Sequence, residues 1–560
     1  MNEYVENLFF SIIIGVVVSF STIFLFEIYS LLQKFASSLF IFSSFFIILI
    51  PPIGMSISYL IVNKISETKT TGCGTHSVID SYLYKSGYIS EKDTLSKTLA
   101  SIITISSGGS AGLEGPSLLL GGGIASFLGK RMNLKPKQLS TIFLCGASAG
   151  LSAIFKAPLT GIFFALEIPY KRDLAKEVFI PASISSIISY VIFISIKGSE
   201  KLFPSITDFS PLQINMFHLI MNSLFTSLVA LFFIRFFKAI NKIVSKINFN
   251  PLLIAMLGGL IIGILGLFMP QCMGVGYDMI HSLISGDYKI FSIEFLILLL
   301  IIKIFVTSIT LNFGGSGGLF IPSIYVGATV GALYNKIFTL NEGQLFIIIS
   351  MAALIAATNK TLLTSIAFVA ETIGPSSIIP TTIAASISYL ITGVNSFYEN
   401  QLLEKPIEEE KALAELQYIF KKSKLEILKR IKASQIMTKN PLFLKENMSI
   451  IDALEAIGKY RFRIYPILDN EKRIVGYVKI EDLLAIPSEK WNLPIYQIII
   501  SKPLIVLENY TLDKIINEMI EKEEDHAFVV ENLDSKKLVG IIAGIDIIKK
   551  LLEIIKEVKY

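Results

Sequence analysis

The feature that most constrains this chain is an internal duplication of glycine-rich segments. Residues 108–116 read GGSAGLEGP and residues 314–322 read GGSGGLFIP, so Pro116 and Pro322 lie 322 − 116 = 206 positions apart. The second copy has Phe320 where the first has Glu114. A fold built from two related halves is therefore the first expectation. The same spacing relates Ser117 to Ser323, Gly121 to Gly327 and Lys130 to Lys336.

The duplication continues further along each half. Residues 156–167 run from a lysine to a glutamate, and residues 360–371 do the same 204 positions later. Hydrophobic segments interrupted by glycine and proline at matching positions of two halves are typical of transporters that bind their solute at the repeat interface. The pattern thus favours a transport function.

The composition places the chain among multi-pass membrane proteins. Hydrophobic residues make up 52% of its 560 residues, and the mean hydropathy is +0.64. We expect membrane helices at Leu8–Leu32 and at Phe35–Val62, the second with a break at Pro51 and Pro52. A net charge of +5 gives no support to nucleic-acid binding, and three scattered cysteines argue against a disulfide framework or a zinc site.

Glu114 is a carboxylate among glycines in an apolar chain, where a charge is costly and usually functional. Glycines allow backbone N–H groups to approach a ligand closely, and the apolar run after Pro116 predicts a helix whose positive end faces Glu114. Helix N-termini of this kind bind anions. The sequence therefore points to anion permeation.

Four segments together resemble the anion-binding segments of the chloride channel (CLC) family of channels and proton-coupled exchangers. They are residues 72–76 (GCGTH), 112–116 (GLEGP), 317–322 (GGLFIP) and 396–399 (SFYE). The resemblance implies an α-helical polytopic membrane protein with two inverted repeats of tilted, broken helices. We place this domain at residues 1–403, with halves at about 5–200 and 210–403.

The resemblance also implies which groups bind the ion. The amides of Leu319 and Phe320 and the hydroxyl of Tyr398 would coordinate a central chloride, with Cys73 at its inner side. Glu114 would be the gate: ionised, it occupies the outer site as an anion mimic, and protonated, it swings out. The neighbouring glycines Gly74 and Gly115 belong to the same set. A homodimer in the cell membrane, with both termini in the cytoplasm, is implied as well.

Two departures from the family pattern bear on function. The family usually has Gly-Ser-Gly-x-Pro where this chain has Cys73 and His76, and a thiol is a weaker donor than a hydroxyl. Proton-exchanging members usually have a second glutamate directly after the position of Glu167, where this chain has Ile168. An aliphatic side chain cannot carry a proton. We therefore favour a chloride channel over an exchanger that uses another proton path.

Further charged residues lie in the apolar part of the chain, and we expect structural roles for several of them. Glu167 and Glu371 match between the halves, which favours a shared structural role. Lys156 and Lys360 also match, and they either attract anions or lie in loops near lipid headgroups. Lys303 is expected to snorkel to a surface.

From residue 404 the composition becomes charged, and we predict a helical linker at 404–432. Strand-like residues 463–468 and 474–478 and a helix at 481–484 follow, and GYVKIED at 476–482 recurs as GIIAGID at 540–546. This α/β pair resembles tandem CBS domains, placed at 433–492 and 493–560. By that resemblance Asp482 and Asp546 would contact the ribose of an adenine nucleotide, although Lys479 and Ala543 replace the usual hydroxyl residues. A purely structural dimerisation role is the alternative.

Two remote alternatives remain for the membrane part. Residues 108–112 fit the Gly-x-Ser-x-Gly pattern of serine hydrolases, with Ser110 as nucleophile, but no histidine stands in a recognisable partner motif. A divalent-cation transporter with CBS domains would need clustered oxygen ligands, and the carboxylates here are isolated. We expect neither an enzyme nor a metal site, and no cofactor is required.

Overall fold

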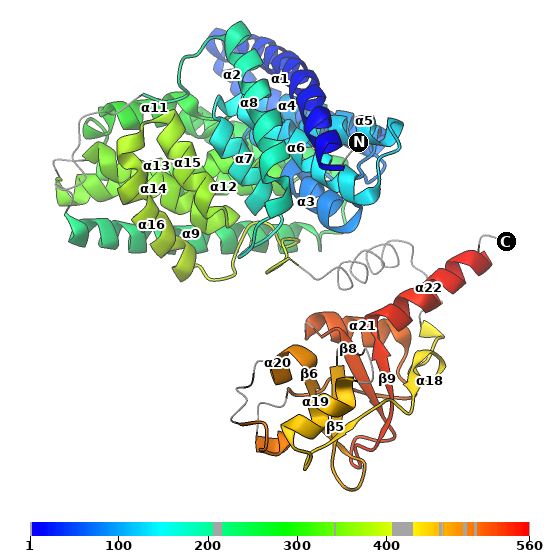
Figure 1. Cartoon of the computed structure of the whole chain (residues 1–560). Helices are drawn as coiled ribbons and strands as arrows, with labels where there is room; N and C mark the ends of the chain where they lie inside the picture. The colour runs from blue at the N-terminus through cyan, green and yellow to red at the C-terminus, as the bar shows by residue number, and fades with distance from the viewer. Residues whose placement is uncertain are drawn as a thin grey trace. The chain divides into compact units, whose positions relative to one another are not determined.

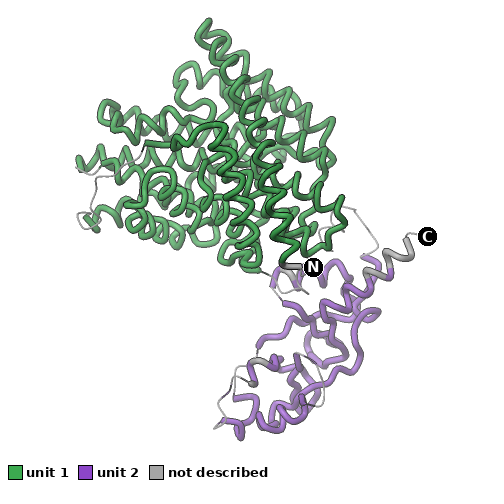
Figure 2. Tube along the Cα trace, turned by 45° about the horizontal axis from the view of Figure 1, so that its top comes forward, with its two compact units in different colours: residues 1–405 green, residues 406–560 purple. Residues whose placement is uncertain are grey.

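The computed structural model describes residues 3–204, 215–340, 343–405, 429–458, 462, 464–484, 486, 490–497, 501–522 and 524–558. These residues form two compact units, which divide between Lys405 and Pro406 (Figure 2). Most of the predicted helical linker at 404–432 lies outside the described residues.

The first unit is almost entirely helical (Figure 1), and seven of its described helices are long and apolar enough to cross a membrane. The first half contains α1 (Glu3–Phe42), α2 (Ser44–Ile65), β1 (Gly72–Cys73), α3 (Gly74–Tyr84), α4 (Glu91–Ser106), α5 (Glu114–Arg131), α6 (Pro136–Phe155), α7 (Pro158–Glu167), the 3-10 turn η1 (Lys176–Val178) and α8 (Phe179–Lys197).

The second half repeats this series. It contains α9 (Met216–Val244), α10 (Pro251–Phe268), η3 (Pro270–Cys272), α11 (Tyr277–Ser285), η4 (Asp287–Lys289), α12 (Ile293–Asn312), β2 (Ser316–Gly317), α13 (Phe320–Phe338), α14 (Gly343–Asn359), α15 (Leu362–Thr372), η5 (Pro375–Ser377) and α16 (Ile378–Ile391).

The bounds of the first two helices differ from the predicted ones, because α1 extends as far as Phe42 and α2 begins only at Ser44. α1 is one helix of 40 residues, and α2 runs through Pro51 and Pro52 without ending. The expected break at these prolines was wrong. α10 packs directly on this point, because a Cβ on Gly259 would lie 2.4 Å from the Cα of Pro52. In a membrane, a neighbouring helix helps to accommodate a proline inside a helix.

Reciprocal hydrogen bonds join the two halves around the glycine-rich segments. The Ser110 amide donates to Thr310 Oγ1 at 3.0 Å, and the Ser316 amide donates to Thr104 Oγ1 at 3.1 Å. Each pair is the other pair moved by 206 positions. Such exchanged contacts are expected when two copies of one fold pack across a pseudo-two-fold axis.

Glu167 and Glu371 make a second reciprocal pair. The Glu167 carboxylate accepts hydrogen bonds from the amides of Leu363 and Thr364, both at 2.8 Å, and from the Thr364 hydroxyl at 2.6 Å, at the start of α15. The Glu371 carboxylate caps α7 in the same way. A carboxylate at a helix N-terminus satisfies free amides and complements the helix dipole. The shared structural role expected for these glutamates agrees with this geometry. The Glu371 partners are the amides of Leu159 and Thr160, both at 2.8 Å, and the Thr160 hydroxyl at 2.7 Å.

The second unit is α/β and contains two small sheets. Its strand orders are β4-β5-β6 and β3-β9-β8-β7, and the short strand β3, although early in the chain, pairs with β9 of the second sheet. Its elements are α18 (Ala433–Ile436), β3 (Thr438–Lys439), β4 (Leu444–Lys445), α19 (Ile450–Gly458), β5 (Ile464–Leu468), β6 (Ile474–Lys479), α20 (Ile480–Leu484), η8 (Ile495–Gln497), β7 (Ile505–Leu507), α21 (Leu512–Glu521), β8 (His526–Val530), β9 (Leu538–Ala543) and α22 (Gly544–Val558).

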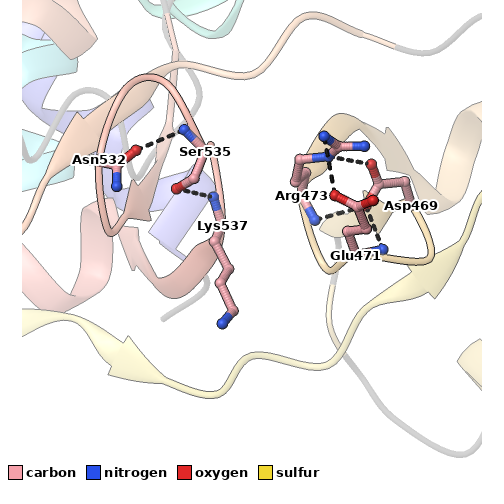
Figure 3. A network of polar contacts seen from close by, with 6 residues as sticks. All are labelled: Asp469, Glu471, Arg473, Asn532, Ser535 and Lys537. Atoms are coloured by element: carbon pink, nitrogen blue, oxygen red, sulfur yellow. Dashed lines mark hydrogen bonds and ion pairs between the residues drawn. The ribbon is translucent and has the colours of Figure 1, made fainter.

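The turns between β5 and β6 and between β8 and β9 lie side by side (Figure 3). The Ile474 amide donates to the Lys536 carbonyl at 3.0 Å, and the Leu538 amide donates to the Lys472 carbonyl at 3.2 Å. These pairs are related by the 64-residue repeat. The second unit is thus a pseudo-symmetric pair of motifs, as the sequence predicted. Within its first turn, Asp469 Oδ2 accepts from Arg473 Nε at 2.7 Å.

The reciprocal caps predict a stability effect. Replacing Glu371 by alanine leaves the Leu159 and Thr160 amides at the start of α7 without their acceptor, and loss of a helix cap costs about 1–2 kcal/mol. We expect the midpoint of thermal unfolding of the purified protein in detergent to fall by about 2 °C or more. The matched control is Glu404→Ala, at an exposed position. Equal midpoints for the two variants would contradict the capping role.

Candidate anion-binding site

The N-termini of α5 and α13 meet at one point of the first unit. The Gly112 amide donates to the Gly318 carbonyl at 3.0 Å, and the Gly318 amide donates to the Gly112 carbonyl at 2.9 Å. The helices begin two residues later, at Glu114 and Phe320. This antiparallel bridge therefore brings two sets of free helix amides together, and such amides attract negative charge.

The Glu114 carboxylate occupies that place. Its side chain is fully buried, and its Oε1 accepts a hydrogen bond from the Phe320 amide at 2.6 Å. The next amide, that of Ile321, is also directed at this carboxylate. Its Oε2 is buried and has no hydrogen-bond partner among the described residues. One carboxylate oxygen is thus bound at the N-terminus of α13, where an anion would bind.

Two glycines make room for this carboxylate. A Cβ on Gly112 would lie 1.9 Å from Glu114 Oε2, and a Cβ on Gly318 would lie 2.0 Å from Glu114 Oε1. Cβ atoms do not approach other heavy atoms so closely. The observed position of the carboxylate thus requires glycine at both positions.

The segment that contains Cys73 joins the same place. β1 pairs with β2 in parallel, with Gly72 opposite Ser316 and Cys73 opposite Gly317. A Cβ on Gly74 would lie 2.8 Å from the carbonyl oxygen of Gly115. Three of the four segments singled out in the sequence are therefore in direct contact.

The fourth segment contributes Tyr398. Its side chain is fully buried, and its phenol lies within electrostatic reach of both Cys73 and Glu114. The hydroxyl donates a hydrogen bond to Asn359 Oδ1 at 2.9 Å, and Asn359 is the last residue of α14. Sequence reasoning missed Asn359. The repeat did not mark it, because the matching residue 204 positions earlier is Phe155.

The Phe320 side chain, which replaces a glutamate in the repeat, packs among aromatic rings. Its ring centroid lies 5.2 Å from that of Phe155, 5.3 Å from that of Phe368 and 5.7 Å from that of Phe164. Only the backbone amide of Phe320 is therefore turned toward Glu114. Nearby, Ile168 is fully buried directly after the end of α7.

The lysines that the sequence offered as anion attractors bind backbone carbonyls instead. Lys156 Nζ donates to the Glu200 carbonyl at 3.0 Å, in agreement with a loop lysine. Lys360 is buried, and its Nζ donates to the Tyr389 carbonyl at 3.0 Å and to Thr392 Oγ1 at 2.6 Å. The buried ammonium of Lys360 thus has a structural role at the end of α16.

The expectation that Lys303 snorkels was wrong. Its side chain is fully buried, and its Nζ donates to the carbonyls of Cys272 and Gly274, both at 3.1 Å. The Nζ also lies 4.4 Å from the centroid of the Tyr325 ring. Two carbonyls and an aromatic face replace water around the ammonium, so the lysine needs no surface.

The surroundings of Ser110 and of the acidic side chains bear on the two remote alternatives, a serine hydrolase and a divalent-cation transporter. Ser110 is fully buried, and its hydroxyl is 2.8 Å from the hydroxyl of Thr307, which is no general base. Among the described residues no group of three or more histidine, cysteine or acidic side chains could hold a metal ion.

In the second unit, the two proposed ribose-contacting residues differ in exposure and in hydrogen bonding. Asp482 is exposed on α20, whereas Asp546 Oδ2 accepts a hydrogen bond from the Ala543 amide at 3.0 Å and so caps α22. Both stand near the start of the helix that follows the last strand of their motif.

The fold and the site together define a class: a membrane protein of two inverted repeats in which two helix N-termini meet at a buried carboxylate. The sequence profile of the voltage gated chloride channel family matches residues 54–393, more than half of the chain, and the chain belongs to this family. The CBS domain profile matches residues 433–489 and 495–553.

Two curated relatives show similarity over most of their own length. An uncharacterised protein of Methanocaldococcus jannaschii is 31% identical over 357 residues, which cover 63% of this chain and 87% of that protein. The voltage-gated ClC-type chloride channel ClcB of Escherichia coli is 28% identical over 302 residues, which cover 52% of this chain and 71% of ClcB.

Solved structures share the fold. A CLC-type fluoride/proton antiporter superposes with a TM-score of 0.64 at 23% identity and covers 72% of this chain and 98% of its own. A slow cyanobacterial Cl-/H+ antiporter gives 0.63 at 20% identity, covering 70% and 96%. A eukaryotic CLC transporter gives 0.62 at 16% identity and covers 98% of this chain and 99% of its own.

The glycine geometry yields a structural prediction. In Gly112→Ala the three atoms nearest to the new methyl group would all belong to the Glu114 carboxylate, which is the flexible end of a side chain. We therefore expect the carboxylate to leave the Phe320 amide while the helices stay in place. A density map of the variant at side-chain resolution tests this.

The matched control for that map is Gly458→Ala, because a Cβ there meets nothing within 4 Å. A Gly112→Ala map in which Glu114 still contacts the Phe320 amide would contradict the argument.

Proposed function

We propose that this chain conducts chloride across the cell membrane through a path that Glu114 opens and closes. The observation that carries the proposal is the buried Glu114 carboxylate at the N-terminus of α13, bound by the Phe320 amide. A carboxylate in a site built from helix amides takes the position that a permeant anion would take.

The path offers neutral donors to a dehydrated ion. The amides of Leu319 and Phe320 would coordinate the central anion, with Cys73 and Gly74 on its inner side and Gly115 beside Glu114. The Tyr398 hydroxyl would join them by turning its proton from Asn359 Oδ1 to the anion. Neutral donors replace the hydration shell without holding the ion as strongly as a charged side chain would. Fast passage needs this balance.

Gating follows from competition between two anions for one site. When Glu114 is ionised, its carboxylate satisfies the amides at the start of α13 and excludes chloride. Protonation removes the negative charge, so the amides no longer favour the side chain over a chloride ion. The unpartnered Glu114 Oε2 is the oxygen available to a proton.

A channel is the first candidate because of Ile168. At the position where proton-exchanging relatives by resemblance have a glutamate, this chain has a fully buried aliphatic side chain. A proton-coupled exchanger is the second candidate, because two of the superposed structures are described as antiporters. Such an exchanger would need another group to deliver protons.

The soluble part would regulate this path. We take residues 1–403 as the transport domain, 404–432 as a linker, and 433–492 and 493–560 as cytoplasmic CBS domains of a homodimer. Asp482 and Asp546 would contact the ribose of an adenine nucleotide bound by the pair.

Chloride efflux from proteoliposomes tests the main proposal. With valinomycin to clamp the voltage and external pH recorded together with efflux, we expect chloride flux without coupled proton movement. In Glu114→Gln, the response of flux to external pH should disappear, because the titrating carboxyl is gone. A response equal to that of the unchanged protein would contradict the gating role, and uphill proton movement would favour the exchanger.

Nucleotide binding is tested by calorimetry on the full-length protein. We expect heat on titration with ATP, ADP or AMP, and a loss of affinity of about tenfold in Asp482→Ala, where a hydrogen bond from ribose to a charged acceptor is removed. Because Asp482 is exposed, this variant should fold normally. Absence of heat with all three nucleotides would leave dimerisation as the role of the pair.

A further inference from the structure

His76 occupies a distinctive place beside the proposed path. It lies in α3, three residues after Cys73, and its ring meets the Tyr398 ring edge-on with centroids 5.2 Å apart. Cys73 and Tyr398 are buried, whereas His76 is half-buried. The imidazole is therefore the more accessible neighbour of two side chains proposed to contact the central anion.

The groups around the imidazole are acceptors or negative charges. The carbonyls of Cys73 and Phe397 face the ring, and the carboxylates of Asp80 on α3 and Glu399 next to Tyr398 act on it. A neutral imidazole has one N–H donor, while a protonated one has two. Burial of the ring lowers the pKa of His76, and these acceptors and carboxylates oppose that effect. An anion beside Tyr398 would add a further negative charge near the ring and so favour its protonation. The Cys73 thiol and the Tyr398 phenol are the other titratable neighbours.

Asn400 holds the chain around this histidine in place. Its Nδ2 donates to the His76 carbonyl at 2.9 Å and to Asp80 Oδ1 at 2.8 Å. The histidine, the carboxylate and the Tyr398 segment are thus tied together by direct contacts.

α3 also lies close to the end of the first unit. Near the far end of α3, the Tyr82 hydroxyl donates to Glu177 Oε1 at 3.1 Å, and Glu177 pairs with Lys405 at 2.7 Å. Lys405 is the last residue of the first unit. These contacts join α3 to the last described residue of the first unit.

We propose that His76 binds a proton at the inner mouth of the path and that this proton and the central anion bind cooperatively. Histidine is the side chain that changes charge near neutral pH without special surroundings. A positive charge against Tyr398 attracts the anion, and by linkage the anion raises the affinity of the imidazole for its proton. This inference rests on the proposed chloride path.

Chloride calorimetry on the full-length protein in detergent tests the inference. All variants carry Glu114→Gln, so that this carboxyl no longer titrates. We expect Glu114→Gln alone to bind chloride about fivefold more tightly at about pH 5.5 than at about pH 7.5, because the proton that binds together with chloride is about a hundredfold scarcer at the higher pH. Adding His76→Asn should abolish the difference. The matched control adds His281→Asn, at an exposed position on α11, and should keep the difference.

The outcomes separate the two proposals. Chloride binding in Glu114→Gln with equal affinity at both pH values overturns the role of His76 and leaves the chloride path standing. A pH dependence that persists after His76→Asn or His76→Gln also overturns it, and two replacements guard against a variant that does not fold. No chloride heat in Glu114→Gln at either pH contradicts the chloride path itself.

Discussion

The membrane unit depends on the pair of backbone hydrogen bonds between Gly112 and Gly318. These bonds hold the N-termini of α5 and α13 against each other, so the free amides of both helices face a small buried volume. Several aligned amides in a low-dielectric place are unfavourable unless a negative charge lies near them. In the present structure the Glu114 carboxyl group occupies that place, with Oε1 against the Phe320 amide. For the same reason, the free amides at these two helix N-termini would attract a small anion.

The contacts that hold the two halves together come in exchanged pairs. The amides of Ser110 and Ser316 bind threonine hydroxyls across the repeat, and Glu167 and Glu371 each cap a helix of the other half. The side chains proposed to bind or gate the anion are at positions where the two halves differ. Glu114 matches Phe320 and Asn359 matches Phe155, so the acid and the amide that binds Tyr398 are each present once. A symmetric scaffold thus positions an asymmetric site.

The sequence predicted the architecture and the site segments, because duplication and glycine spacing are visible in it. Residues 112–115 and 318–320 stand out through the duplication, and residues 72–74 through the resemblance to the family; the three segments contact one another. Features set by the surroundings of one side chain were not predictable. Lys303 lies buried because carbonyls far along the chain fold over it, and Pro51 and Pro52 stay within a helix because α10 packs there. The role of Asn359 became visible only once Tyr398 was seen beside it.

The central claim is that Glu114 occupies an anion site, and the most direct test is to find an anion there when the carboxylate is absent. Crystals of Glu114→Ala grown in bromide would locate the ion by its anomalous scattering. We expect a bromide peak against the amides of Phe320 and Ile321, where the carboxylate lies in the unchanged protein. Bromide bound elsewhere in the path, with none at these amides, would contradict the account.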